Sequence, residues 1–466
     1  MKKEINVWWA LLPIVVMIIA MMITIIVLKQ EPHMPLLIGT SVAAFVAWKH
    51  KFKWKEIEEM MMKGIKLALP AVIIIMLVGL IIGSWIGGGI ISTMIFYGLK
   101  IMNPTYFLVT ISIICAIVSL VTGTSWGTMG TVGVAGLGIG LSMGIPAAMI
   151  VGAIISGAYF GDKMSPLSDT TNLAAGLTHT DLFVHIKNMF YTTIPGLVIA
   201  LIVYYFLGKN YGITTSNMQD INQVITVLQN EFIISPWLLL VPVAVLILVI
   251  FKLPAVPVLS LGVVLGFLMQ IIVQGDSISS TVNVLQSGYV LETNNEMVNE
   301  LLNSGGLDSM MFTVSLVIVA MTFGGILEYS GILDSLVQQL LKVVKSTGGL
   351  IASTLGTSFF TNVTCSEQYI SIVVPSRMFV QAYKDKGLHS KNLSRALEDG
   401  GTLTSVFVPW NTCGVFIYGT LGVSAFSYAP YTVLNYSVPV ISLFFAFTGI
   451  TIAKIATEAA EEERNE

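Results

Sequence analysis

Long apolar segments recur from one end of the chain to the other, and short polar segments separate them. A transmembrane helix needs about 20 consecutive apolar residues. The pattern predicts an all-α polytopic membrane protein with ten to thirteen transmembrane helices, some of them broken or re-entrant. The predicted spans are 7–28, 34–48, 67–89, 104–122, 146–160, 190–208, 236–251, 254–274, 310–330, 348–363, 368–382, 404–423 and 434–455.

Two segments carry polar residues where apolar ones are expected. They are residues 123–130 and 161–172, and both combine glycine or proline with hydroxyl or carboxylate side chains. Unpaired polar groups and irregular backbone are costly in hydrocarbon, so such segments persist where they line a cavity or bind an ion. They predict broken helices around a buried ion site.

The second of these segments is rich in oxygen ligands. Pro166 removes a backbone donor and frees a nearby carbonyl. Asp162 and Asp169 would share one helix face if the helix were unbroken, and hard cations such as Na⁺ prefer oxygen ligands. A carboxylate at this depth holds either a proton or a cation, which is the minimal chemistry of an antiporter. We expect Na⁺ at Asp162 and Asp169, with further ligands from Thr124, Ser125, Ser165, Ser168 and Asn172.

Other interpretations of these residues stay open. A solvated loop of turn residues would have a similar composition to residues 161–172. Lys163 pairing with Asp162 or Asp169 would change the charge of the site. Arg377 lies inside a predicted span, where a cation is costly unless it is paired or binds an anion, so it is a candidate anion contact.

A weak internal repeat relates the two halves. Gly-Thr-Ser-Trp at 123–126 precedes Gly-Asp at 161–162, and Gly-Thr-Ser-Phe at 356–359 precedes Glu-Asp-Gly-Gly at 398–401. Inverted repeats that each contribute a broken helix build the midplane site of many secondary transporters. The second-repeat candidates are Asn362, Thr364, Glu367, Asp399, Thr402 and Asn411; for Asp399 a helix cap is the alternative role.

Charge and composition restrict the protein class. The chain is 55% hydrophobic and 11% charged, with a net charge of −3, so nothing indicates nucleic-acid binding. Three cysteines in or beside apolar segments do not suggest disulfides. Lysines crowd residues 49–66 and 384–395, which predicts that both loops and the N-terminus are cytoplasmic. No histidine falls inside a predicted span, which argues against a membrane-embedded enzyme, and two unlike polar segments argue against a channel filter.

These features predict five regions. They are N-terminal helices with a basic loop (1–66), a first transport repeat (67–208), linking helices with an external polar loop (209–309), a second transport repeat (310–455) and an acidic cytoplasmic tail (456–466).

Two motifs resemble those of the NhaC family of Na⁺/H⁺ antiporters. They are Ala-Ile-Val-Ser-Leu-Val-Thr-Gly-Thr-Ser-Trp-Gly-Thr at 116–128 and Ser-Gly-Ala-Tyr-Phe-Gly-Asp-Lys-Met-Ser-Pro-Leu-Ser-Asp at 156–169. The resemblance implies a secondary active transporter of the cell membrane that exchanges Na⁺, or Li⁺, for H⁺ by alternating access. One branch of the family instead implies malate and sodium-lactate exchange, and amino-acid transport is a further alternative. Expected partners are the two ions, small carboxylates, the lipid bilayer and further copies of the chain; no cofactor is expected.

Overall fold

The computed structural model describes residues 5–28, 30–211, 215–251, 253–295, 298–299, 302–343 and 346–455. These residues form helices with short connections, together with one β-bridge between Leu388 and Lys454. The predicted acidic tail, 456–466, lies outside the described residues.

The helices of the first half are α1 (Val7–Met22), α2 (His33–Lys49), α3 (Trp54–Gly87), α4 (Ile90–Ile101), α5 (Phe107–Thr122), α6 (Ser125–Thr128), α7 (Val134–Ser142), α8 (Ala147–Met164), α9 (Asp169–Leu177), α10 (Leu182–Lys209) and α11 (Thr215–Glu231). Those of the second half are α12 (Leu240–Ile250), α13 (Ala255–Ile272), α14 (Ile278–Ser287), α16 (Leu307–Ser330), α17 (Ile332–Val343), α18 (Thr347–Cys365), α19 (Gln368–Asp385), α20 (Ser390–Leu397), α21 (Thr412–Leu421), α22 (Ala425–Tyr428) and α23 (Val433–Thr448). Three π-helical turns are η1 (Ile23–Val27), η3 (Met129–Gly133) and η5 (Glu398–Thr402), and η6 (Ser405–Phe407) is a 3₁₀ turn.

The predicted helical membrane fold is confirmed, but the predicted number of crossings is not. Every predicted span overlaps helical residues. By length and composition, five helices among the described residues could cross a membrane, or up to seven if each of two sharply bent helix pairs counts as one span. One of these pairs, α21 followed by α22, bends by 89°. Breaks of this kind make an apolar run in the sequence a poor guide to a complete crossing.

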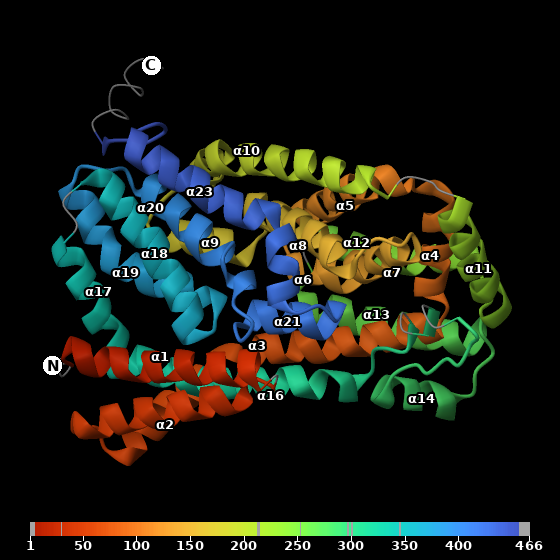
Figure 1. Cartoon of the computed structure of the whole chain (residues 1–466), viewed down its shortest axis with the longest axis horizontal. Coiled ribbons are helices and arrows are strands. Elements are labelled where there is room, and N and C mark those ends of the chain that lie inside the picture. The colour runs from red at the N-terminus through yellow and green to blue at the C-terminus, as the bar shows by residue number, and fades with distance from the viewer. Residues whose placement is uncertain are drawn as a thin grey trace.

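Two long antiparallel helices, α3 and α16, run along the molecule side by side (Figure 1). Small residues allow the contact. A Cβ atom added at Gly64 would lie 2.1 Å from the Met321 carbonyl oxygen, and one at Gly79 would lie 2.7 Å from that of Gly306. Close backbone approach through glycine is typical of packing between membrane helices, where burial of apolar surface supplies little driving force. This pair forms the base on which the broken helices lie.

One helix in each half, α5 in the first and α18 in the second, breaks with the same backbone geometry. α5 ends at Gly123 (φ 71°, ψ 23°) and Thr124 (φ −145°, ψ 120°), and α18 ends at Ser366 (φ 58°, ψ 21°) and Glu367 (φ −145°, ψ 130°). Ser366 follows Gly123 by 243 positions (366 minus 123). A left-handed residue followed by an extended residue thus stops one helix and starts the next in both halves.

A second break repeats at the same separation. Ser-Pro-Leu-Ser at 165–168 joins α8 to α9, and Val-Pro-Trp-Asn at 408–411 joins η6 to α21. In both, an extended residue precedes proline, and the fourth residue caps the next helix with its side chain. Since α3 and α16 occupy equivalent places and run antiparallel, the predicted inverted repeats are confirmed (Figure 1).

The predicted match of Gly356 with Gly123 is wrong, although the break of the second repeat does fall where the candidates Thr364 and Glu367 were expected to lie. Gly356 lies inside α18 rather than at a break. The break depends on a left-handed backbone conformation that does not require glycine, and Ser366 adopts it. With the separation of 243, the counterpart of Asp162 is Ser405 (405 minus 162), not Asp399.

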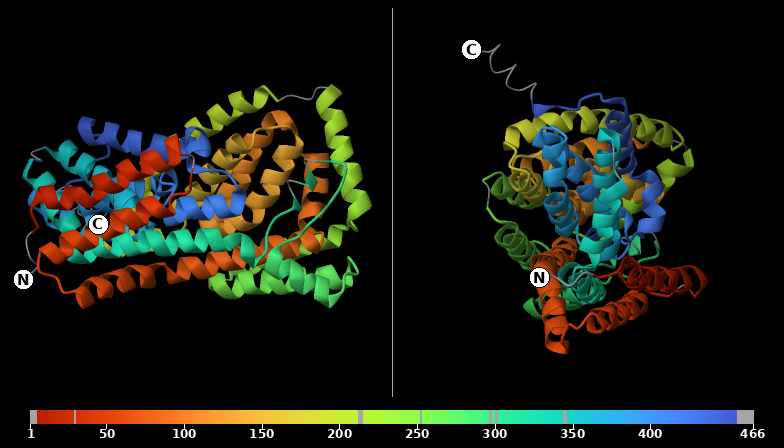
Figure 2. Two further views of the ribbon diagram at one scale, coloured as in Figure 1. Left: turned by 60° about the horizontal axis from the view of Figure 1, so that its bottom comes forward. Right: turned by 90° about the vertical axis from the view of Figure 1, so that its left-hand side faces the viewer.

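The outer helices present apolar side chains on the surface. On α10, Val198, Ile202 and Phe206 are exposed. α2 and α10 lie on opposite sides of the bundle, and α11 crosses one end of it (Figures 1 and 2). An apolar outer surface of this extent is typical of contact with lipid.

Candidate functional site

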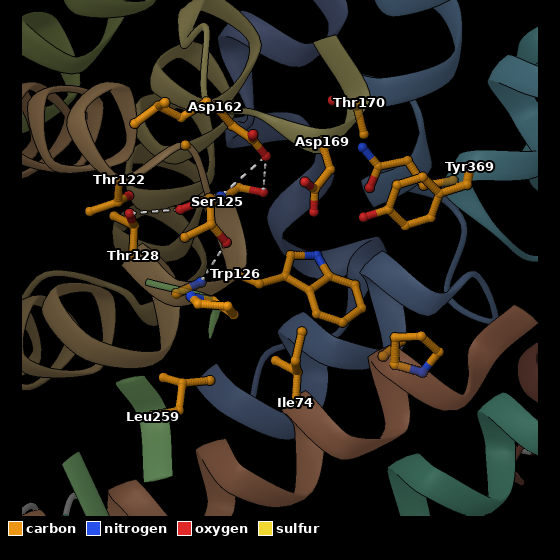
Figure 3. Close-up of a pocket in the computed structure, with 18 of the residues that line it drawn as sticks. Ile74, Thr122, Ser125, Trp126, Thr128, Asp162, Asp169, Thr170, Leu259 and Tyr369 are labelled. Atoms are coloured by element: carbon orange, nitrogen blue, oxygen red, sulfur yellow. Dashed lines mark hydrogen bonds between the residues drawn. The ribbon is translucent and has the colours of Figure 1, made fainter. Parts of the chain in front are cut away.

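A cavity of about 760 Å³ lies beside the two broken helices, α5–α6 and α18–α19. Its walls come from both repeats, and polar side chains from α6, α8, α9 and α19 point into it (Figure 3). The charged groups that line it are Asp162, Asp169, Glu328, Glu367 and Arg377. Four acidic groups against one basic group favour the entry of cations.

Asp162 is held by the first helix break. The Ser125 amide and hydroxyl both donate to Asp162 Oδ2, over 3.1 and 2.6 Å. Ser125 is placed there because Gly123 ends α5 and Thr124 then caps α6, accepting from the Gly127 amide at 3.2 Å. Asp162 is 7% exposed, so these two donors fix the direction of a nearly buried carboxylate (Figure 3).

Two glycines of α8 bring Asp162 to this break. A Cβ atom at Gly157 would lie 2.1 Å from the Ser112 carbonyl oxygen, and one at Gly161 would lie 2.3 Å from that of Ala116. α8 therefore packs directly on the backbone of α5, and Asp162, the next residue after Gly161, reaches the start of α6.

The remaining first-repeat candidates divide into two groups. Asp169 begins α9 and points into the cavity, as Figure 3 shows. The side chains of Ser165, Ser168 and Asn172 instead bond the backbone of the break: Ser165 Oγ accepts from the Leu167 amide at 3.2 Å, Ser168 Oγ caps α9, and Asn172 Nδ2 donates to the Pro166 and Ser168 carbonyls. These three side chains are not among the residues that line the cavity.

Glu367 is the second-repeat candidate that reaches the cavity. It is the counterpart of Thr124 and caps α19 in the same way, because its Oε2 accepts from the Ile370 amide at 3.1 Å. Thr412 donates to its Oε1 at 3.5 Å. The carboxylate is 4% exposed.

Three other second-repeat candidates hold the backbone together. Asn362 Nδ2 donates to the Gly401 carbonyl at 2.7 Å, and Asn411 Nδ2 donates to Asn362 Oδ1 at 3.1 Å. Thr364 donates to a carbonyl of its own helix. Asn362 and Asn411 tie α18, η5 and the start of α21 together, and none of the three side chains lines the cavity.

Lys163 pairs with Asp399 and not with Asp162 or Asp169, so neither predicted partner is found. Both side chains are fully buried, and the pair joins α8 of the first repeat to η5 of the second. Thr192 of α10 also donates to Asp399 Oδ1, at 3.3 Å. Asp399 and the nearby Thr402 lie outside the cavity lining, and among the described residues no lysine or arginine pairs with Asp162.

Comparison with known proteins agrees with this architecture. The sequence pattern of the Na⁺/H⁺ antiporter family matches residues 157–450, which include the second break of both repeats. The chain belongs to the Na⁺/H⁺ antiporter family. Two relatives named Na⁺/H⁺ antiporter NhaC are similar to it: that of Alkalihalophilus pseudofirmus is 40% identical over 97% of this chain and 98% of the relative, and that of Bacillus subtilis is 38% identical over 90% and 93%.

A third relative differs in its named substrates. The malate-2H⁺/Na⁺-lactate antiporter of Bacillus subtilis is 38% identical over 88% of this chain and 89% of the relative. The resemblance to the NhaC family is thereby confirmed, and this Na⁺/H⁺ antiporter family member is an integral membrane transport protein.

Sequence reasoning missed several cavity residues of this antiporter family member. Glu328, which ends a long apolar run and was not among the candidates, lines the cavity, and its Oε1 lies 3.7 Å from Arg377 Nη1. Tyr369 and Thr170 also line it, and each lies two positions after the residue that caps its helix, Glu367 and Ser168 respectively. His185 was predicted to lie in a loop, but it is fully buried in α10, which begins eight residues earlier than the predicted span.

Proposed function

We propose that this protein exchanges Na⁺ for H⁺ across the bacterial cytoplasmic membrane by alternating access. The observation that carries the proposal is Asp162: a nearly buried carboxylate at a helix break, lining a cavity and held by Ser125. Among the described residues, no lysine or arginine pairs with it.

The chemistry of exchange follows from the cost of burying charge. An ionised carboxylate away from water is costly unless a cation or several donors compensate it. Asp162 therefore holds Na⁺ or a proton, and each excludes the other. Carboxylate and hydroxyl oxygens suit Na⁺, and Asp169, Ser125 and Thr124 lie around the same cavity to complete its shell. The transported ions are the only ligands that this function requires.

The inverted repeats supply the two access states. The site lies where the broken helices of the two repeats meet, and rocking of one repeat against the other opens such a site to either side in turn. The buried pair between Lys163 and Asp399 joins the repeats at this point.

The orientation follows from the basic loops. The α2–α3 and α19–α20 junctions lie at the same end of the molecule as the start of the described chain (Figure 1). Both junctions are rich in lysine, which by the positive-inside rule supports a cytoplasmic location for this end and for the N-terminus.

A second function is coupled exchange of a small carboxylate. The volume of about 760 Å³ exceeds what a single cation needs, and Arg377, with a side chain 66% exposed, stands at the cavity where an anionic group could pair with it. Trp126 stacks on Phe416 at 4.3 Å between ring centroids and makes one wall apolar.

Transport by the purified protein separates the two functions. Liposomes that hold a pH-sensitive dye receive Na⁺ or Li⁺, with and without malate or lactate, under an imposed proton gradient. Na⁺/H⁺ exchange predicts proton movement with the cation alone. Proton movement that requires the organic acid would replace the first function by the second.

A further inference from the structure

Glu398 is a buried carboxyl group that the proposed sodium site does not use. It is fully buried at the start of η5, and neither of its carboxylate oxygens has a hydrogen-bond partner among the described residues. The hydroxyls of Thr402 and Thr170 lie beside it without making a hydrogen bond of standard geometry. An ionised carboxylate in such surroundings is very costly, so Glu398 carries a proton in this conformation.

The nearby cations around η5 have other partners and do not pair with the Glu398 carboxyl group. Lys163 is the nearby cation, and its ammonium group is already paired with Asp399. Arg395 donates instead to Asn188 and Thr451. The described parts of α18 and α23 carry no Asp, Glu, Lys, Arg or His. The titratable or charged groups on the other elements around η5 are Tyr159, Asp162 and Lys163 of α8, Asp169 of α9, His185, Lys187, Tyr191, Tyr204, Tyr205 and Lys209 of α10, Tyr369, Arg377, Tyr383, Lys384 and Asp385 of α19, and Lys391 and Arg395 of α20.

The repeat shows that the fold does not require an acid here. The counterpart of Glu398 in the first repeat is Ile155 (398 minus 155 is 243), which is fully buried. The counterpart of Asp162 is Ser405, which has no charge. Asp162 and Glu398 are therefore buried acids at positions that are not symmetry related, and Glu398, unlike Asp399, has no cation paired with it. A π-helical turn at Glu398 is a further mark of a functional segment, because such turns occur frequently at functional sites.

Thr170 connects Glu398 to the sodium site. It lines the cavity together with Asp162 and Asp169 (Figure 3), and its hydroxyl also lies beside Glu398. When Asp162 and Glu398 are both ionised they repel each other across a medium of low dielectric constant. At a pH where Asp162 is ionised before Na⁺ arrives, Na⁺ removes that repulsion, so a proton on Glu398 is then released more readily.

We propose that Glu398 binds a transported proton of its own and releases it when Na⁺ binds at Asp162. The inference rests on the proposed function. The O–H bond of Glu398 breaks, the proton passes to the cavity past Thr170, and the carboxylate left behind shares the Lys163 ammonium group with Asp399. In the return step Na⁺ leaves Asp162 ionised, the repulsion is restored, and Glu398 takes up a proton again.

Proton release on Na⁺ binding tests this directly. Na⁺ is titrated into the purified protein in detergent by calorimetry in several buffers of different ionisation enthalpy, which gives the number of protons released per Na⁺ bound. We expect Glu398→Gln to bind Na⁺ and to release one proton fewer than the wild type. Glu398→Asp should keep the wild-type number, and Glu58→Gln, at an exposed position on α3, is the matched control.

Each outcome decides between the alternatives. If Glu398→Gln and the wild type release the same number of protons, the assignment of Glu398 as a proton site is wrong, while the proposed Na⁺/H⁺ exchange still stands. Absence of Na⁺-linked release in the wild type would overturn the proposed function itself. Glutamine is the neutral isostere of a protonated glutamate, so we expect an unchanged thermal unfolding midpoint; a Glu398→Gln protein that fails to fold would show an ionised structural carboxylate and contradict the proposal.

Discussion

Lys163 and Asp399 form a fully buried ion pair between the two repeats, one residue away from Asp162 on one side and from Glu398 on the other. Lys163 and Asp399 neutralise each other, and each is the sequence neighbour of an acid assigned to ion transport, Asp162 or Glu398. The acids on either side are thus left to be neutralised by the transported ions.

Removal of one partner of this pair should be strongly destabilising. Lys163→Met or Asp399→Leu alone leaves an uncompensated buried charge and should cost about 3–5 kcal/mol of unfolding free energy. The double variant Lys163→Met/Asp399→Leu should recover most of the loss. Thermal unfolding of the wild type, the two single variants and the double variant in detergent gives the coupling free energy between Lys163 and Asp399. Additive effects of the two single changes would mean that the pair does not form.

Ser125→Ala should weaken Na⁺ binding. The change removes one of the two donors that fix Asp162 and one oxygen of the cation shell, while the backbone amide stays. Loss of a hydrogen bond to a charged group, about 1.5 kcal/mol or more, corresponds to about a tenfold higher half-saturating Na⁺ concentration. Ser142→Ala is the control, because this buried hydroxyl donates to a carbonyl of its own helix. Equal effects of the two changes on transport would exclude a direct role for Ser125.

Gly161→Ala should destabilise the protein. The new methyl group would lie 2.3 Å from the Ala116 carbonyl oxygen, and overpacking of this kind costs about 1–3 kcal/mol. Gly356→Ala is the matched change inside α18, where an added Cβ meets nothing within 4 Å, and it should stabilise the helix by about 1 kcal/mol. Thermal unfolding midpoints compare them. A larger loss at Gly356 would restore the repeat register that the sequence suggested.

Protons should compete with Na⁺. If Asp162 holds one or the other, the half-saturating Na⁺ concentration rises as the pH falls, by up to about tenfold per pH unit, and levels off in alkaline solution. Initial rates of Na⁺-driven proton flux over a pH series measure this. A half-saturating concentration that does not change with pH would show that the two ions do not share a site.

The sequence predicted the positions of the helix breaks better than the contacts between side chains of the two repeats. The left-handed residue and the Ser-Pro-Leu-Ser turn are local features, so residues 123–130 and 161–172 could be recognised as broken helices. The pairing of Lys163 with Asp399 joins residues 236 positions apart, and only the packed repeats reveal it.

The repeat register failed for a physical reason. The sequence at Gly356 matches that of the first break, but the chain is helical there. The break geometry of the second repeat occurs at Ser366 and Glu367, whose residue types differ from those of Gly123 and Thr124. For the same reason, residue type alone could not separate cavity ligands from side chains such as Asn172 and Asn362, which bond to the backbone of the breaks.

The central claim is that Asp162 holds the transported cation, and Na⁺-driven proton flux in liposomes tests it most directly. Asp162→Asn should reduce the flux by about 100-fold or more, since a charged ligand is lost. Asp385→Asn, at an exposed position at the end of α19, should leave it unchanged. Wild-type flux from the Asp162→Asn protein, with the same half-saturating Na⁺ concentration, would contradict the account.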